Sequence, residues 1–262
     1  MWVSKKPPAV PSLEKHPPST AKRFTDVCVT HLLVHRQSWI RRKMEELGIK
    51  TARDAVEFVI RKIDYPFTRG LPDDKHLWNA FSGKACYQIS MDYWQTADET
   101  LMTFVLNSKH GKNGYGDCED TSILTASMLR LLSVPCYVVL GMVYRDGIPL
   151  GGHGWVIAEF PDKKWRLVET TLDEPPIWFS GYPEVNPEEN KWKVGNIVYE
   201  GWIKFNEKEY YEWEGGNMLE KYVKMGFREK ETVRKHKAIS EAFKVRSKAL
   251  KHRRLLGRLR WR

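Results

Sequence analysis

One cysteine stands where a turn is expected to become a helix. Cys118 lies within the run Gly114–Ser122, whose glycines favour a sharp turn and whose Asp117 suits a helix N-cap. A thiol at a helix N-terminus lies against unpaired backbone N–H groups and the positive end of the helix dipole, which favours the thiolate. Glu119 and Asp120 suit the same helix end but oppose a thiolate, so a nearby imidazolium is needed. The alternative is a buried cysteine with a structural role.

An imidazole and a carboxylate follow this helix on predicted strands. Three segments rich in valine and aromatic residues are predicted to form an antiparallel meander, namely Cys136–Tyr144, His153–Phe160 and Trp165–Thr171. Residues 145–152, rich in glycine, are predicted to be the first connecting loop. His153 begins the middle strand and Glu169 lies near the end of the next strand, and these two ends are neighbours in a hairpin.

The register of these two strands decides whether His153 and Glu169 meet. If Glu159 opposes Trp165, His153 lies diagonal to Glu169 on one face of the sheet. A four-residue loop that pairs Phe160 with Trp165 would instead place them on opposite faces. Chemistry that uses both side chains requires the first register.

Together these residue types make up a cysteine-based triad. Cys118 would supply the thiolate nucleophile, His153 the imidazole that holds and moves its proton, and Glu169 the acid that orients the imidazole. Asp173 is a rival for the acid role, although it lies past the expected strand end. The structural alternative for His153 is a histidine that is hydrogen-bonded to a loop carbonyl. The alternative for Glu169 is an exposed carboxylate on a strand.

The order and spacing of these motifs resemble the transglutaminase-like superfamily. The similarity rests on the Gly-Asp-Cys-Glu-Asp run at residues 116–120, on His-Gly-Trp at 153–155, on Trp-Arg-Leu-Val-Glu at 165–169 and on the upstream stretch Tyr93–Leu101. It covers roughly residues 55–175. The resemblance implies an α+β, papain-like fold in which the helix bearing the nucleophile packs on an antiparallel sheet. It also implies a triad of Cys118, His153 and Glu169, with glutamate where the family more often has aspartate.

Acyl transfer also needs hydrogen-bond donors for the developing oxyanion. By the same resemblance, the backbone N–H of Cys118 is one candidate donor. The amide of Gln95 or the indole N–H of Trp94 is the second. The alternatives are a core position for Trp94 and a helix start for Gln95.

Length and composition limit the class of protein. The chain has 262 residues and 11 tryptophans, enough for one large domain with a well-filled core. Its four cysteines form no Cys-x-x-Cys pair, which argues against a zinc site and a disulfide scaffold, so we expect no metal and no cofactor. No apolar run reaches the roughly 18 residues of a membrane span, and the first residues do not resemble a signal peptide. A cytoplasmic location is therefore expected.

Four segments are expected along the chain. Residues 1–20 combine prolines with lysines and are predicted to be an extended or disordered leader. Residues 21–64 are predicted to be helical, with helices at Phe24–Leu47 and Ala52–Ile63. Residues 65–205 would hold the catalytic core, and residues 206–262 would form a C-terminal extension that ends in a basic helix.

The C-terminal end carries the net charge of the chain. Residues 235–262 contain 11 Lys and Arg residues against one acid, which equals the formal net charge of +10 for the whole chain. The remaining residues balance, with 32 basic and 32 acidic side chains (43 − 11 and 33 − 1). Such an end could contact nucleic-acid phosphates, an anionic membrane surface or an acidic partner. The alternative is a solvated surface helix.

Two classes of function follow from these features. The first is a cysteine-dependent acyl-transfer enzyme that hydrolyses a peptide or carboxamide bond of a protein or peptide substrate through a thioester, as a protease or a deamidase. Transfer to an amine is a variant of the same chemistry. The second is a catalytically inactive protein on the same fold, attached to nucleic acid or another polyanion by residues 235–262.

Overall fold

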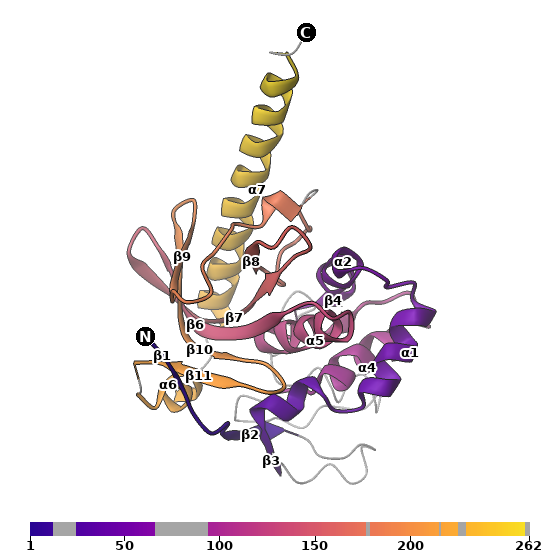
Figure 1. Cartoon of the computed structure of the whole chain (residues 1–262). Helices are drawn as coiled ribbons and strands as arrows, with labels where there is room; N and C mark the ends of the chain where they lie inside the picture. The colour runs from indigo at the N-terminus through magenta and orange to yellow at the C-terminus, as the bar shows by residue number, and fades with distance from the viewer. Residues whose placement is uncertain (13–24, 66–93, 177–178, 215, 225–228, 260–262) are drawn as a thin grey trace.

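The computed structural model describes residues 1–12, 25–65, 94–176, 179–214, 216–224 and 229–259 (Figure 1). In these ranges the helices are η1 (Val29–Leu33), α1 (Gln37–Glu46), α2 (Ala52–Lys62), α4 (Ala97–Ser108), α5 (Cys118–Leu131), η4 (Phe179–Gly181), α6 (Met218–Lys224) and α7 (Glu229–Leu259). The strands are β1 (Trp2–Ser4), β2 (Ala9–Ser12), β3 (Thr25–Cys28), β4 (Ile63–Asp64), β5 (Gly114–Tyr115), β6 (Cys136–Arg145), β7 (Ile148–Glu159), β8 (Trp165–Val168), β9 (Lys191–Val194), β10 (Ile197–Phe205) and β11 (Tyr210–Trp213).

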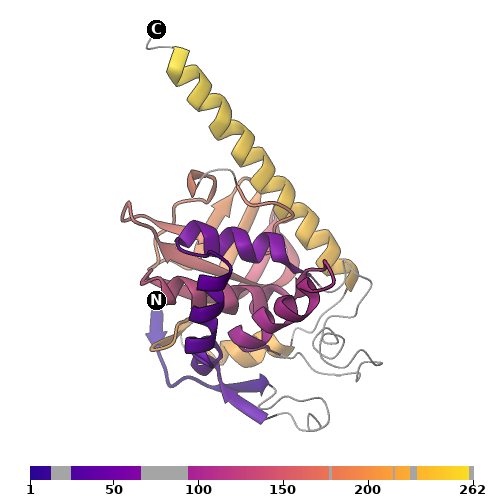
Figure 2. The same ribbon diagram turned by 90° about the vertical axis from the view of Figure 1, so that its right-hand side faces the viewer.

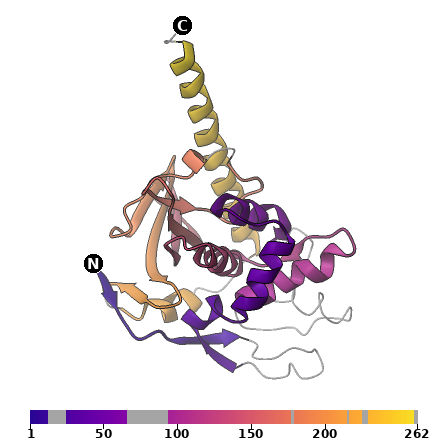
Figure 3. The same cartoon turned by 45° about the vertical axis from the view of Figure 1, so that its right-hand side comes forward.

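A seven-stranded antiparallel sheet forms one layer of the molecule (Figures 1 and 3). Its strand order is β1-β11-β10-β6-β7-β8, and β9 also pairs with β10. The central strands β6, β7 and β10 are largely buried, which suits their many β-branched and aromatic residues. The sheet therefore joins strands from both ends of the chain to the predicted meander.

Helix α5 lies between this sheet and the helices η1, α1, α2 and α4. Its first turn is closed by a capping box in which the side chains of Asp117 and Asp120 each accept the other residue's backbone N–H. All side chains of Cys118–Leu129 are buried. The helix packs on β6 and β7, and η1, α1, α2 and α4 also contact it (Figure 2). A helix enclosed in this way holds its first residue in a fixed place relative to the sheet.

The predicted α+β arrangement is confirmed, with two corrections in the meander. The helix begins at Cys118, and β6, β7 and β8 lie in the three predicted strand segments, but β8 ends at Val168 and not at Thr171, so Glu169 directly follows the strand. In addition, β7 begins at Ile148, so the loop predicted over residues 145–152 is wrong. Asp146 and Gly147 have φ angles of 51° and 81°, the left-handed conformations that a two-residue hairpin turn requires. The following residues can therefore pair with β6 at once.

The N-terminal prediction was only partly right. Helix α2 lies within one residue of its predicted bounds, because Thr51 and Asp54 form a capping box at its start. The predicted helix Phe24–Leu47 is wrong in its first half, which forms β3 and the short helix η1; Phe24 itself lies outside the described residues. Arg36, with a φ angle of 48°, interrupts the helical backbone before α1 begins. Within the predicted leader, Trp2–Ser4 pairs with β11 at the edge of the sheet.

Helix α7 has two different parts. Its first part packs against β7, β9, β10 and η4, and buries a stripe of residues at helical spacing: Lys235, Ala238, Ile239, Ala242 and Phe243. Its distal part extends away from the body in each view (Figures 1, 2 and 3). The basic segment predicted from residue 235 onward therefore begins inside the core. Neither α7 nor another helix of the described ranges has the length and apolar character needed to cross a bilayer.

Candidate active site

The turn before α5 brings Cys118 against strand β7 of the sheet. Gly154 of β7 lies directly against the start of α5, and a Cβ atom there would come within 3.1 Å of the Cys118 carbonyl oxygen. A side chain at this position would push backbone against backbone, so glycine permits the close approach. Since His153 precedes Gly154, this packing places the histidine beside the first turn of the helix.

The strand register is the one that the triad requires. Glu159 pairs with Trp165, and the ladder continues to Val156 opposite Val168. His153 and Glu169 consequently meet, with 2.9 Å between the histidine Nε2 and the carboxylate Oε2. Both side chains have 0% exposure. The histidine Nδ1 has no hydrogen-bond partner among the described residues, so it is the ring nitrogen available to the neighbouring thiol.

Glu169 is held by three donor groups besides the histidine. The hydroxyl group of Tyr199 on β10 donates to its Oε2 atom at 2.8 Å. The backbone N–H and the hydroxyl group of Thr171 donate to its Oε1 atom at 3.0 and 2.7 Å. Burial alone raises the pKa of Glu169, but His153 and Thr171 lower it to about 2. The carboxylate is therefore charged and fixed in orientation across the neutral pH range.

Charges around the thiol favour a thiolate–imidazolium pair. Burial alone raises the pKa of the Cys118 thiol, but the positive charges of Lys235 and His153 reverse this effect and lower the pKa to about 6. Burial lowers the pKa of His153, whereas Glu169 and Cys118 raise it, and the net shift is upward. At neutral pH the cysteine and histidine together therefore keep their shared proton on the imidazole.

The other described thiols differ from Cys118. Cys28 is exposed, and Cys136 is buried, which raises its pKa far above that of an ordinary thiol. Cys86 lies outside the described residues. Among the described cysteines, Cys118 is thus the one whose surroundings favour a nucleophilic thiolate. No group of three or more His, Cys, Asp or Glu side chains in the described ranges could hold a metal ion.

Residues from α6 and α7 cover the thiol, and no pattern in the sequence predicted that they would. The Tyr222 hydroxyl group on α6 lies 4.0 Å from the Cys118 Sγ atom. On α7, Lys235 donates a hydrogen bond to the backbone carbonyl of Gly152, and the His236 ring lies edge-on to His153 with 5.9 Å between ring centroids. Cys118 consequently has only 5% exposure. These contacts join segments about 100 residues apart, which local patterns cannot predict.

The predicted oxyanion donors, Gln95 and Trp94, lie next to the residues that surround Cys118. Gln95 precedes α4, where its backbone N–H and its side-chain Nε2 donate to the carboxylate of Asp120 at 2.8 and 2.6 Å. Trp94 is fully buried, and its ring lies edge-on to Tyr222, with 6.2 Å between centroids. Both residues are thus fixed near the start of α5, and their role as donors remains a prediction.

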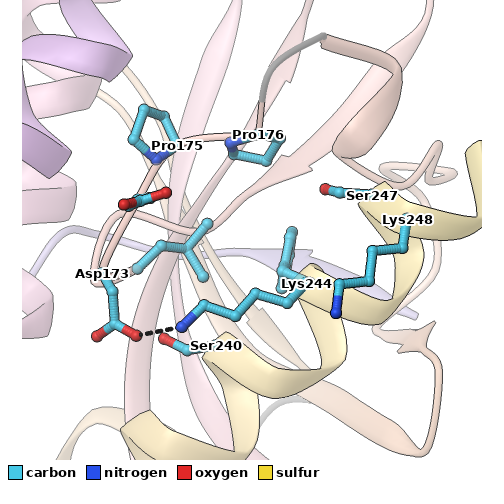
Figure 4. Close-up of a pocket in the computed structure, with 10 residues that line it drawn as sticks. Asp173, Pro175, Pro176, Ser240, Lys244, Ser247 and Lys248 are labelled. Atoms are coloured by element: carbon cyan, nitrogen blue, oxygen red, sulfur yellow. Dashed lines mark hydrogen bonds and ion pairs between the residues drawn. The ribbon is translucent and has the colours of Figure 1, made fainter. Parts of the chain in front are cut away.

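Asp173, the rival acid, faces away from the histidine. It is exposed and pairs with Lys244 of α7 at 2.9 Å, as Figure 4 shows. This pair borders a pocket between the segment Leu172–Pro176 and α7, which Pro175, Pro176, Ser247 and Lys248 also line (Figure 4). Glu169 is therefore the carboxylate that contacts His153.

Replacing Tyr199 with phenylalanine should test the support of Glu169. Loss of the donor to a charged carboxylate should reduce the free energy of unfolding by about 2 kcal/mol near pH 7. Because the folded pKa of Glu169 is lowered, its carboxylate stabilises the fold above the ordinary value of about 4.3, and this contribution is lost as the pH falls toward 2. The difference between Tyr199→Phe and the wild type should therefore shrink over that interval in acid denaturation curves.

Tyr210→Phe is the matched control for this variant. Tyr210 is also buried, and it donates to the carboxylate of Glu212 at 2.7 Å on β11, which is three strands away from β7 in the sheet. Tyr210→Phe should lower stability to a similar degree while leaving the alkylation rate of Cys118 unchanged, and Tyr199→Phe should slow that alkylation. Equal alkylation rates in both variants would contradict the role given to Tyr199.

Comparison with known proteins identifies a family to which part of this chain is similar. Residues 61–170 match the family described as the transglutaminase-like superfamily, and this span contains Cys118, His153 and Glu169. A solved structure from Cytophaga hutchinsonii, described as a candidate cysteine protease, is similar over 66% of this chain and 50% of its own length, with 16% identity and a TM-score of 0.32. This chain thus spans half the length of that protein. Among curated proteins none matches the chain. The resemblance predicted from the sequence is confirmed, since residues 61–170 match the transglutaminase-like superfamily.

Proposed function

We propose that this protein is a cysteine-dependent acyl-transfer enzyme. In this proposal Cys118 is the nucleophile, His153 the general acid and base, and Glu169 the residue that orients the imidazole. The observation that carries the proposal is the fully buried His153–Glu169 pair beside a thiol whose pKa is lowered to about 6. The match to the transglutaminase-like superfamily supports a cysteine-dependent enzyme at the level of the family.

The chemistry begins with attack of the Cys118 thiolate on the carbonyl carbon of an amide. The C–S bond forms, the carbonyl π electrons move to oxygen, and the imidazolium of His153 then donates its proton to the leaving nitrogen as the C–N bond breaks. A thioester with Cys118 and a free amine or ammonia result. His153, now neutral, takes a proton from water, whose oxygen attacks the thioester and releases the acid and the thiolate.

Hydrolysis is the outcome we propose, with the acyl group passing to water. The substrate class is a protein or peptide that presents a peptide or side-chain carboxamide carbonyl. An amine that replaced water in the second half-reaction would give cross-linking instead, through the same thioester. The Cys118 backbone N–H, with Gln95 or Trp94, is proposed to stabilise the oxyanion of each tetrahedral intermediate. A reducing compartment such as the proposed cytoplasm would keep the thiol available for this chemistry.

Thioester formation should be visible by intact-protein mass spectrometry. Wild-type protein mixed at acidic pH with a peptide thioester or activated ester should gain the acyl mass at Cys118 and lose it when the pH is raised. Cys118→Ala and His153→Ala should lower turnover by more than about 10³-fold, and Glu169→Gln by about 10²–10⁴-fold, because the triad acts as a unit. Circular dichroism and thermal melts serve as the control for folding.

A well-folded Cys118→Ala protein that retained wild-type turnover would contradict the proposal. So would an acyl group found on the exposed Cys28 and none on Cys118. If Cys118→Ala prevents folding, the structural role considered from the sequence is the better interpretation. Cys118→Ser, which keeps a polar side chain of similar size, then decides between the two.

A second function, attachment to a polyanion, is favoured by the form of α7. The distal part of the helix extends away from the body (Figures 1 and 2). Residues 251–262 contain six Lys and Arg residues and no acid. We propose that this distal segment contacts nucleic-acid phosphates, without reading bases. This segment would attach to nucleic acid either the enzyme proposed above or, in the alternative, a catalytically inactive protein.

Deleting residues 251–262 should weaken binding to a short fluorescent DNA duplex in anisotropy titrations. For every phosphate that the truncated protein no longer neutralises, the slope of log affinity against log salt should also fall by about 0.9. Alkylation of Cys118 should be unchanged, because the buried part of α7 remains. A full-length control in which the exposed Lys109 and Lys112 become glutamine should bind like the wild type. Full affinity in the truncated protein would rule out the distal segment as the binding surface.

A further inference from the structure

A buried lysine enters the candidate active site from the C-terminal helix. Lys235 has 3% exposure, although lysine is almost never fully buried without a partner. Its ammonium group donates to the backbone carbonyl of Gly152, the residue before His153. On the other side of the histidine, Gly154 packs against the Cys118 carbonyl oxygen. Lys235 thus fixes the same short stretch of β7 that positions the imidazole beside the thiol.

The charges facing Cys118 leave a role for a second cation. On α5, the carboxylate of Glu119 lies 3.1 Å from the Cys118 Sγ atom, where it accepts a hydrogen bond from the neutral thiol. Burial of this sulfur disfavours its ionised form, so positive groups must offset the lost hydration. On β7, His153 provides one positive charge, but its Nε2 side is already paired with Glu169. The imidazolium of His153 is thus shared between the thiolate and the carboxylate of Glu169.

The histidine next to Lys235 does not supply this charge. Burial lowers the pKa of His236 well below its ordinary value, and the charges of Lys235 and His153 lower it further. Its neutral ring packs against Tyr65, with 4.3 Å between centroids, as well as against His153. Tyr222, which approaches the sulfur from α6, carries a hydroxyl group and not a cation. Lys235 is thus the additional positive group that the described elements bring to the thiol.

We propose that Lys235 is a positioning residue for the thiol chemistry: it holds β7 beside His153 and provides the second positive charge that stabilises the Cys118 thiolate. This inference rests on the proposed function, since it assigns a role within the same reaction. The lowered pKa of Cys118, to which the charge of Lys235 contributes, agrees with it. The nucleophile on α5 would then depend on α7, which begins more than 100 residues later in the chain.

The test is the pH dependence of Cys118 alkylation by iodoacetamide, followed by peptide mass spectrometry. Lys235→Met removes both the charge and the hydrogen bond, Lys235→Gln keeps an N–H donor without the charge, and Lys235→Arg keeps the charge. Lys237→Met, which changes an exposed lysine on the same helix, is the matched control. Since an opposite charge nearby lowers a pKa by about 1–3 units, Lys235→Met and Lys235→Gln should slow alkylation at pH 6 by about tenfold or more.

The expected pattern is a slow reaction in the two uncharged variants and near wild-type rates in Lys235→Arg and Lys237→Met. If Lys235→Met fails to fold, the comparison of Lys235→Gln with Lys235→Arg gives the answer. Wild-type rates at pH 6 in a folded Lys235→Gln protein would overturn the role of its charge. If Cys118 of the wild type is itself unreactive at pH 6, the proposed function fails, and this inference fails with it.

Discussion

The whole site depends on keeping an ion pair inside the protein. A thiolate and an imidazolium with almost no exposure to water are stable only when neighbouring groups replace the lost hydration. Glu169 does this for His153, and the carboxylate is in turn held by Tyr199 and by Thr171. Each partner is buried or nearly so, and removal of one leaves an uncompensated charge behind. The same network that stabilises the fold thus sets the protonation state of the thiol.

This requirement explains why the site is assembled from distant segments. The capped start of α5 provides the thiol, and β7 provides the imidazole. The residue that follows β8 provides the acid, and β10 provides the tyrosine that completes the network. Helix α7 then closes the site with Lys235 and His236, and its other end projects from the body as a basic helix (Figure 1). One continuous helix therefore joins the candidate active site to the surface proposed to bind a polyanion.

Much of the candidate site was predictable because its determinants are local. The glycine-rich turn and Asp117 mark the start of α5, and of the two registers considered for β7 and β8, the one with Glu159 opposite Trp165 occurs. Contacts with Tyr199, Tyr222 and Lys235 were not predictable, since they arise from packing between segments far apart in sequence. The errors in the predicted helix Phe24–Leu47 and in the predicted loop 145–152 have a local cause. Arg36 and Asp146 adopt left-handed backbone conformations that are uncommon for residues other than glycine. Helix α1 therefore begins later, and strand β7 earlier, than predicted.

The most direct test of the ion pair is the pH dependence of Cys118 alkylation in the wild type and in His153→Ala. Peptide mass spectrometry can follow Cys118 and the exposed Cys28 in the same sample, so that Cys28 serves as an internal reference. The structure predicts a midpoint near pH 6 for Cys118 in the wild type, and a rise toward the ordinary thiol value of about 8.5 when His153 is lost. A Cys118 midpoint at or above about 8.5 in the wild type, unchanged by His153→Ala, would show that no thiolate–imidazolium pair exists.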